Sequence, residues 1–173
     1  YCRFFINFFM VMGFLLGLSS CKKMEEYPVE PAITFNSISK IDNGTGIDNY
    51  GLLMIDFTDG DGDVGLSETD IQAPYDTSSI YYYNFFIEYY EKQHGVFVKP
   101  TLYETFNARI PILNTSTEDQ PLKGTISIQI PINNITSNFD TIRFDCQICD
   151  RALHMSNKIS SPEIIIKKID GNT

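Results

Sequence analysis

The sequence predicts an all-β fold, an antiparallel sandwich of two sheets with seven or eight strands. Short runs rich in Ile, Phe, Tyr and Thr alternate apolar with polar residues at a period of two, while helical periodicity is nearly absent. Clusters of Gly, Asn, Asp and Pro separate these runs. The chain from residue 31 to residue 173 is long enough for one domain with its own core.

Eight runs carry the strand pattern. Most are neighbours in the sequence, which favours a two-sheet sandwich, and a partly closed barrel is the alternative. In chain order the expected strands are 32–40 (AITFNSISK), 50–58 (YGLLMIDFT), 80–91 (IYYYNFFIEYYE), 95–99 (GVFVK), 104–112 (ETFNARIPI), 123–131 (KGTISIQIP), 140–149 (DTIRFDCQIC) and 158–168 (KISSPEIIIKK).

The stretch TIRFDCQICDRALHMSN, residues 141–157, ends a hydrophobic strand with Asp150 and leads through a short turn into Ser-Asn. It resembles the terminal hairpin of bacterial immunoglobulin-like domains. The resemblance implies that the sandwich is immunoglobulin-like. ALHM lies where those domains carry a glycine-bearing turn.

The N-terminus carries a targeting pattern. Residues 4–18 (FFINFFMVMGFLLGL) form an apolar run too short for a typical membrane span. LSSC, residues 18–21, follows at once and resembles the lipobox of bacterial lipoproteins. That resemblance implies a signal peptide over residues 1–20 and lipid on Cys21, followed by a tether to residue 30. An uncleaved anchor and a non-lipidated secreted product are the alternatives.

The residues behind the cysteine, KKMEE, are similar to export signals of surface lipoproteins in the Bacteroidetes. Together with the loop DGDGDVG, they make the chain resemble uncharacterised lipoproteins of that group. The resemblance implies a lipid-anchored protein of the outer membrane, exposed at the cell surface. It implies no particular activity. Apart from the resemblance, we expect an envelope protein or a glycan as the partner of this chain.

The charge of the chain excludes one class of partner. Its formal net charge is −9, and no basic or aromatic-basic patch offsets it. An acidic surface repels phosphate backbones. Nucleic acid is therefore not expected to bind.

Asp59, Asp61 and Asp63 alternate with glycines in the loop DFTDGDGDVG. Calcium prefers six to eight hard oxygen ligands, and such a loop can turn several carboxylates toward one point. If the strands ending near Thr58 and Cys149 are the second and sixth of the sandwich, Asp150 joins this end too. The residues predict a structural calcium site. A solvated Asp-Gly turn is the alternative.

CQIC places Cys146 and Cys149 three residues apart on an expected strand. Side chains at that spacing point to opposite faces, and redox CxxC pairs begin helices. Cys146 is expected in the core and Cys149 at the strand end, without a thiol pair or a zinc site.

The aromatic run at 80–91 divides into two faces. Alternation assigns Tyr81, Tyr83, Phe85, Ile87 and Tyr89 to the core. The opposite face carries Tyr82, Phe86 and Tyr90, a candidate ladder for stacking on a ligand. Packing beneath a neighbouring loop is the other interpretation.

Signatures of common enzymes are missing from the sequence, including GxSxG, HExxH and Gly-rich nucleotide loops. A non-enzymatic binding or scaffolding module is therefore the expected function. The alternative is a carbohydrate-binding or glycosidase-type protein, because glycosidase carboxylates lie far apart in sequence.

Overall fold

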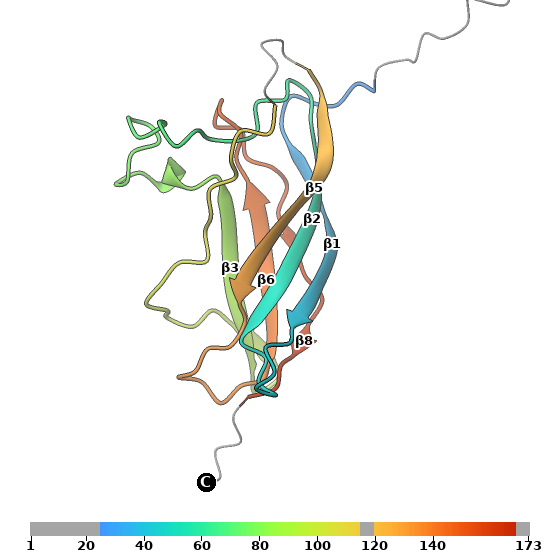
Figure 1. Ribbon diagram of the computed structural model, residues 1–173, viewed down its shortest axis with the longest axis vertical. Coiled ribbons are helices and arrows are strands. Elements are labelled where there is room, and N and C mark those ends of the chain that lie inside the picture. The colour runs from blue at the N-terminus through green and yellow to red at the C-terminus, as the bar shows by residue number, and fades with distance from the viewer. Residues whose placement is uncertain (1–24, 115–119, 169–173) are drawn as a thin grey trace, which may run out of the picture.

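A computed structural model describes residues 25–114 and 120–168 of the chain. Two antiparallel sheets pack face to face, so the predicted all-β sandwich is confirmed and the partly closed barrel is not formed. The first sheet has the order β1–β2–β5 (Figure 1). Its strands are β1 (Ala32–Ile41), β2 (Tyr50–Asp59) and β5 (Leu122–Pro131).

The second sheet has the order β4–β3–β6–β7, and β8 also pairs with β6. Its strands are β3 (Phe85–Gln93), β4 (Val96–Val98), β6 (Thr141–Ile148), β7 (Ile159–Ser160) and β8 (Ile164–Ile165). A short 3-10 helix, η1 (Ile80–Tyr82), precedes β3.

The core lies between the sheets and follows the alternation read from the sequence. On β3 the side chains of Phe85, Ile87 and Tyr89 are buried, as predicted. On β6 the buried series includes Phe144 and Cys146. Each fully buried side chain of this kind contributes about 1.5–3 kcal/mol to folding.

The aromatic run becomes a strand later than predicted. Tyr81 and Tyr83 lie before β3 and are only half-buried. The hydroxyl of Ser79 caps η1 by accepting from the N–H of Tyr81 at 3.1 Å. Local side-chain bonds of this kind compete with strand pairing, so extended pairing starts only at Phe85.

No strand forms over the predicted range 104–112, which makes only single bridges to its neighbours. Side chains take the place of ladder bonds there. Asn107 Oδ1 accepts from the N–H of Ile87 at 2.9 Å, and the Arg109 guanidinium donates to backbone carbonyls, among them that of Ser67 at 3.0 Å. Pro111 has no N–H to offer to a ladder. The segment therefore crosses toward β3 as irregular chain.

The last predicted strand, 158–168, divides into β7 and β8 on either side of Pro162. Two serine hydroxyls accept hydrogen bonds from backbone N–H groups of the adjoining β6 that pair with no strand. Ser156 Oγ accepts from the N–H of Ile148, and Ser161 Oγ accepts from the N–H of Phe144, both at 3.0 Å.

Strands β2 and β6 end at the same end of the sandwich, the upper end in Figure 1. The chain enters from residue 25 at this end too. Residues 1–24, with the predicted signal peptide and Cys21, lie outside the described residues. In the described part, no helix is long and apolar enough to cross a membrane.

Candidate metal centre

The loop after β2 carries Asp59, Asp61 and Asp63, called here the aspartate group. Alternate side chains of β2 point into the core, and Asp59 continues that series as the last residue of the strand. Its exposed fraction is 0%. A core-facing position therefore holds a carboxylate where a hydrophobic side chain would be expected.

The three carboxylates converge on one point. One oxygen from each lies within 4.8 Å of the other two. The Oδ1 atoms of all three are buried, and none has a hydrogen-bond partner in the described part of the chain. Burying carboxylate oxygens without partners costs free energy unless a cation or donor compensates. The Asp59–Asp61–Asp63 group could hold a metal ion.

Backbone donors fix the orientation of two of these carboxylates. Asp59 Oδ2 accepts from the N–H of Val64 at 3.1 Å, and Asp63 Oδ2 accepts from the N–H of Ala152 at 3.1 Å. Each therefore has one oxygen held by the protein and the other turned toward the group. The bond to Ala152 also ties the loop to the turn after β6.

Electrostatics in the group disfavour ionisation without a counter-ion. Burial raises the pKa of Asp59 to about 6, with repulsion from Asp61, Asp63 and Asp150 adding to the shift and the Val64 N–H opposing it. Burial also raises the pKa of Asp63, again with repulsion from Asp150 and Asp61. A cation among the carboxylates would reverse both effects.

Asp150 is 2% exposed and close enough to repel the aspartate group, which places it at the same end of the sandwich. Both of its oxygens already have partners. Oδ1 accepts from the N–H of His154 at 2.7 Å, and Oδ2 lies 2.8 Å from His154 Nδ1. The structure thus brings Asp150 beside the three converging carboxylates, and not among them.

Three other segments enclose the loop. Gly62 and Gly65 have φ of +73° and +126°, a region that favours glycine. A Cβ at Gly62 would lie 2.0 Å from the carbonyl oxygen of Gln120, and one at Gly65 would lie 2.4 Å from that of Pro111. A Cβ at Gly60 would likewise meet the carbonyl of Tyr27 at 2.3 Å. The glycines were visible in the sequence, but nothing there pointed to the segments they contact.

The two cysteines of CQIC are free and buried, with exposed fractions of 3% and 1%. Cys146 packs in the core cluster, and Cys149 makes a bridge to Met155 just after the strand. Burial raises the pKa of both thiols to about 12. Neither is a reactive thiolate at neutral pH.

The candidate stacking residues separate in the structure. Tyr82 lies in η1, with the Arg109 guanidinium 4.8 Å from its ring centroid. Tyr90 lies on the outer face of β3 under Arg143, at 5.1 Å. Phe86 lines a groove along β3 that neither tyrosine lines. The three rings therefore form no continuous ladder.

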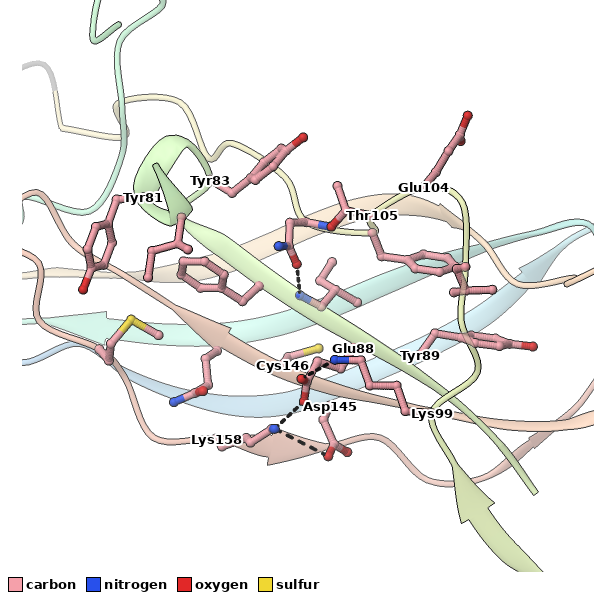
Figure 2. A pocket seen from close by; sticks show the side chains of 18 of the residues that line it. Tyr81, Tyr83, Glu88, Tyr89, Lys99, Glu104, Thr105, Asp145, Cys146 and Lys158 are labelled. Carbon is pink, nitrogen blue, oxygen red and sulfur yellow. Dashed lines mark hydrogen bonds and ion pairs between the residues drawn. The ribbon is translucent and has the colours of Figure 1, made fainter. Parts of the chain in front are cut away.

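This β3 groove has a volume of about 770 Å³ and lies between β3 and the chain at 99–107. Figure 2 shows Tyr81 and Tyr83 toward one end of it and a charged cluster of Glu88, Lys99 and Lys158 farther along. Sequence reasoning missed the two tyrosines as groove residues because it placed them in the core.

The three charged groups of this cluster are paired with one another. Lys158 and Lys99 both donate to the Glu88 carboxylate, the latter at 2.7 Å. Hydrogen bonds from these two lysines lower the pKa of Glu88 to about 2. Asp145 lies opposite Glu88 on β6 and accepts from the Ser160 hydroxyl at 2.7 Å. Glu88 is thus held as a carboxylate, which disfavours a role as general acid.

The chemistry of the aspartate group is that of a hard-cation site, since it offers three carboxylates and neither imidazole nor thiolate. No protein-family model, curated protein or solved structure matches this chain.

Proposed function

We propose that the chain is a non-enzymatic binding or scaffolding module, an immunoglobulin-like β-sandwich with a structural calcium ion at one end. The observation that carries the proposal is the set of three buried Oδ1 atoms without partners in the described residues. Calcium suits them because it accepts several carboxylates in an irregular shell, whereas magnesium demands near-octahedral geometry and retains more water.

A structural role fits the position of the site better than a catalytic one. Asp59 is fully buried and Asp61 and Asp63 are half-buried, so much of the surface of an ion held by the three would be enclosed by protein. The nearby imidazole of His154 is bonded to Asp150. An ion at the aspartate group would instead fix the loop against the turn at Ala152. These features support a clamp between two loops.

Lipid on Cys21 remains part of the proposal, together with an outer-membrane, cell-surface location. Tyr27 and Pro28 run against Gly60 in the aspartate loop. A lipid attached only a few residues earlier would hold this end of the sandwich toward the membrane. Replacing Cys21 with Ala should abolish incorporation of labelled palmitate into the protein in the producing cell, whereas Cys2→Ser should not, and equal labelling of both variants would contradict lipid on Cys21.

Isothermal titration of the purified chain tests the calcium site. We expect one Ca²⁺ per chain, bound at least about tenfold more tightly than Mg²⁺ because of the shell each ion requires. Asp61→Asn with Asp63→Asn should abolish binding. Asp42→Asn with Asp140→Asn removes the same charge from exposed positions and should leave binding intact. Equal binding by both double variants would refute the site.

Binding of a neutral saccharide in the β3 groove is the second candidate function. It is favoured by Tyr81, Tyr83 and Phe86, which line a groove whose two lysines are already paired with the Glu88 carboxylate. Aromatic rings pack against the apolar faces of sugars, and polar side chains bind their hydroxyls.

Cellohexaose and maltohexaose are suitable probes for the groove, with tyrosine fluorescence as the signal. Phe86→Ala should weaken binding of either sugar about tenfold, equivalent to about 1.4 kcal/mol. Tyr90→Ala removes an aromatic ring from the same strand outside the groove and should have no effect. Absence of binding by the unmodified chain would remove this candidate.

A further inference from the structure

Strand β5 forms an edge of the three-stranded sheet. It pairs with β2 over its full length, and no strand of the described residues pairs with its other side. The opposite edge of the same sheet is protected, because the side-chain amide of Asn157 bonds both the N–H and the carbonyl of Ile33 on β1. Among the described residues, no strand or side-chain amide bonds the β5 edge in this way, although residues 108–111 and Leu113 line a groove beside it.

The backbone groups at the β5 edge can be identified from the register. Ile132 donates to the carbonyl of Asn49 at 2.9 Å, so even-numbered residues direct their backbone groups toward β2. Odd-numbered residues direct theirs outward, and Pro131, which lacks an N–H, fits that side. The outward-facing residues before it are Lys123, Thr125, Ser127 and Gln129.

The strand that could have covered this edge is missing. The range 104–112 has strand-like sequence, but Ala108 bridges Phe85 on β3 instead. As a result Ile126 and Ile128, on the inner face of β5, are only half-buried. With Leu113, which is 40% exposed, they line a groove of about 290 Å³ beside the edge.

Between Lys123 and Pro131, the edge lacks the features that usually prevent strand addition. Natural edge strands carry charges, prolines or bulges. The segment TISIQI, residues 125–130, has no charge and no proline, and its pairing with β2 shows no bulge. Its β-branched residues favour an extended partner.

We propose that the β5 edge binds a second copy of this chain, with the two β5 strands antiparallel across a two-fold axis. The register centred on Ile126 pairs all four outward-facing residues of each strand, so that Thr125 faces Ser127 of the second copy. Lys123 faces the neutral Gln129 of the second copy, so no like charges meet. The half-buried isoleucines of both copies come together on the inner face.

The symmetry of this register favours a second copy over another protein. One uncharged segment supplies both strands, as an isologous contact requires. Pairing would join the two three-stranded sheets into one of six strands and remove both bare edges. The interface does not involve the aspartate group, so calcium binding and dimer formation can fail independently.

A charge-swap experiment tests the contact in the full chain, dispersed in nonionic detergent because of its apolar N-terminal run. Sedimentation equilibrium should show a dimer. Thr125→Lys with Ser127→Lys should give a monomer, because each lysine then faces a lysine of the second copy. Thr125→Lys with Ser127→Glu should restore the dimer through two Lys–Glu pairs. Both variants change the same exposed positions, and their thermal unfolding shows whether each remains folded.

Disulfide trapping tests the register, in the chain with Cys2→Ser and Cys21→Ser. Ile126→Cys should cross-link most of the protein, since facing residues of such a pair lie about 4.5 Å apart. Ile128→Cys should cross-link little, because its two copies would be roughly 14 Å apart. A monomeric parent chain, a dimer indifferent to the charge swap, or equal cross-linking at both positions would overturn the proposal.

Discussion

Asp59→Asn is expected to raise the free energy of unfolding of the metal-free chain at pH 7.5 by about 2–3 kcal/mol. The pKa of Asp59 is raised from 3.8 to about 6, so folding the ionised form costs about 1.4 kcal/mol for each unit. Asn keeps the shape of the side chain and can still accept from the Val64 N–H. It also removes one charge from a repelling set.

The effect of Asp59 on the free energy of unfolding depends on pH. Because the folded pKa is raised, protonated Asp59 stabilises the metal-free protein fully below about pH 3.8, and this contribution is lost as pH rises through about 6. Urea unfolding in EDTA should therefore show the parent chain losing stability between about pH 4 and 7 relative to Asp59→Asn. The two chains should converge at the acid end.

Calcium should reverse the order of the two proteins. A ligand that binds only the folded state adds about 4.1 kcal/mol at a thousand times its dissociation constant, which exceeds the advantage of about 2–3 kcal/mol expected for Asp59→Asn. The parent chain should gain this at pH 7.5, and Asp59→Asn should gain little. Asp140→Asn is the control, an exposed aspartate at the start of β6. A destabilised Asp59→Asn protein that still responds to calcium would contradict both the electrostatics and the site.

The sequence predicted the features that depend on the local alternation of apolar and polar residues. Burial alternates along β2 throughout and along β6 except at the buried Asp145, and the inward-facing half of that alternation forms the core. The aspartate group was predictable for the same reason, since its three residues lie within five positions of one another at the end of a strand. The approach of Asp150 followed from strand order, but its engagement by His154 did not.

The parts that were not predictable depend on side chains replacing backbone partners over long sequence distances. Asn84 bonds both the N–H and the carbonyl of Ile110. Arg109 donates to the carbonyls of Ser67 and Asp70 in the loop after β2 and to that of Tyr82 in η1. These bonds hold 104–112 out of the sheet, although its composition is that of a strand. No residue pattern within the segment encodes where its partners lie.

The second large effect is expected at Glu91, which ends the buried series of β3 much as Asp59 ends that of β2. Its exposed fraction is 1%. Unlike Asp59, it is fully supplied with donors. Oε1 accepts from the Tyr89 hydroxyl at 3.2 Å and Asn134 Nδ2 at 2.9 Å, while Oε2 accepts from Gln93 Nε2 at 3.2 Å and Ser137 Oγ at 2.8 Å.

Lys168 completes this cluster from the C-terminal segment. Its ammonium donates to the carbonyls of Asn134 and Ser137 at 3.0 and 2.8 Å. Burial lowers the pKa of Lys168, and the Glu91 carboxylate opposes that shift. Glu91 therefore joins β3, the turn at 133–137 and the C-terminal segment at the end of the sandwich opposite the aspartate group.

Glu91→Ala should lower the free energy of unfolding by about 3–5 kcal/mol, because it leaves a cavity and several buried donors without an acceptor, and because it removes one of the two carboxylates that offset the charge of Lys168. Glu91→Gln keeps two oxygen-sized groups in place and should cost less. Glu163→Ala is the matched control, since Glu163 pairs with Lys92 at 2.7 Å but its side chain is 51% exposed, and its loss should cost less than about 1 kcal/mol. Urea unfolding with calcium present measures all three. Equal small losses for Glu91→Ala and Glu163→Ala would mean that solvent reaches the cluster and would contradict this prediction.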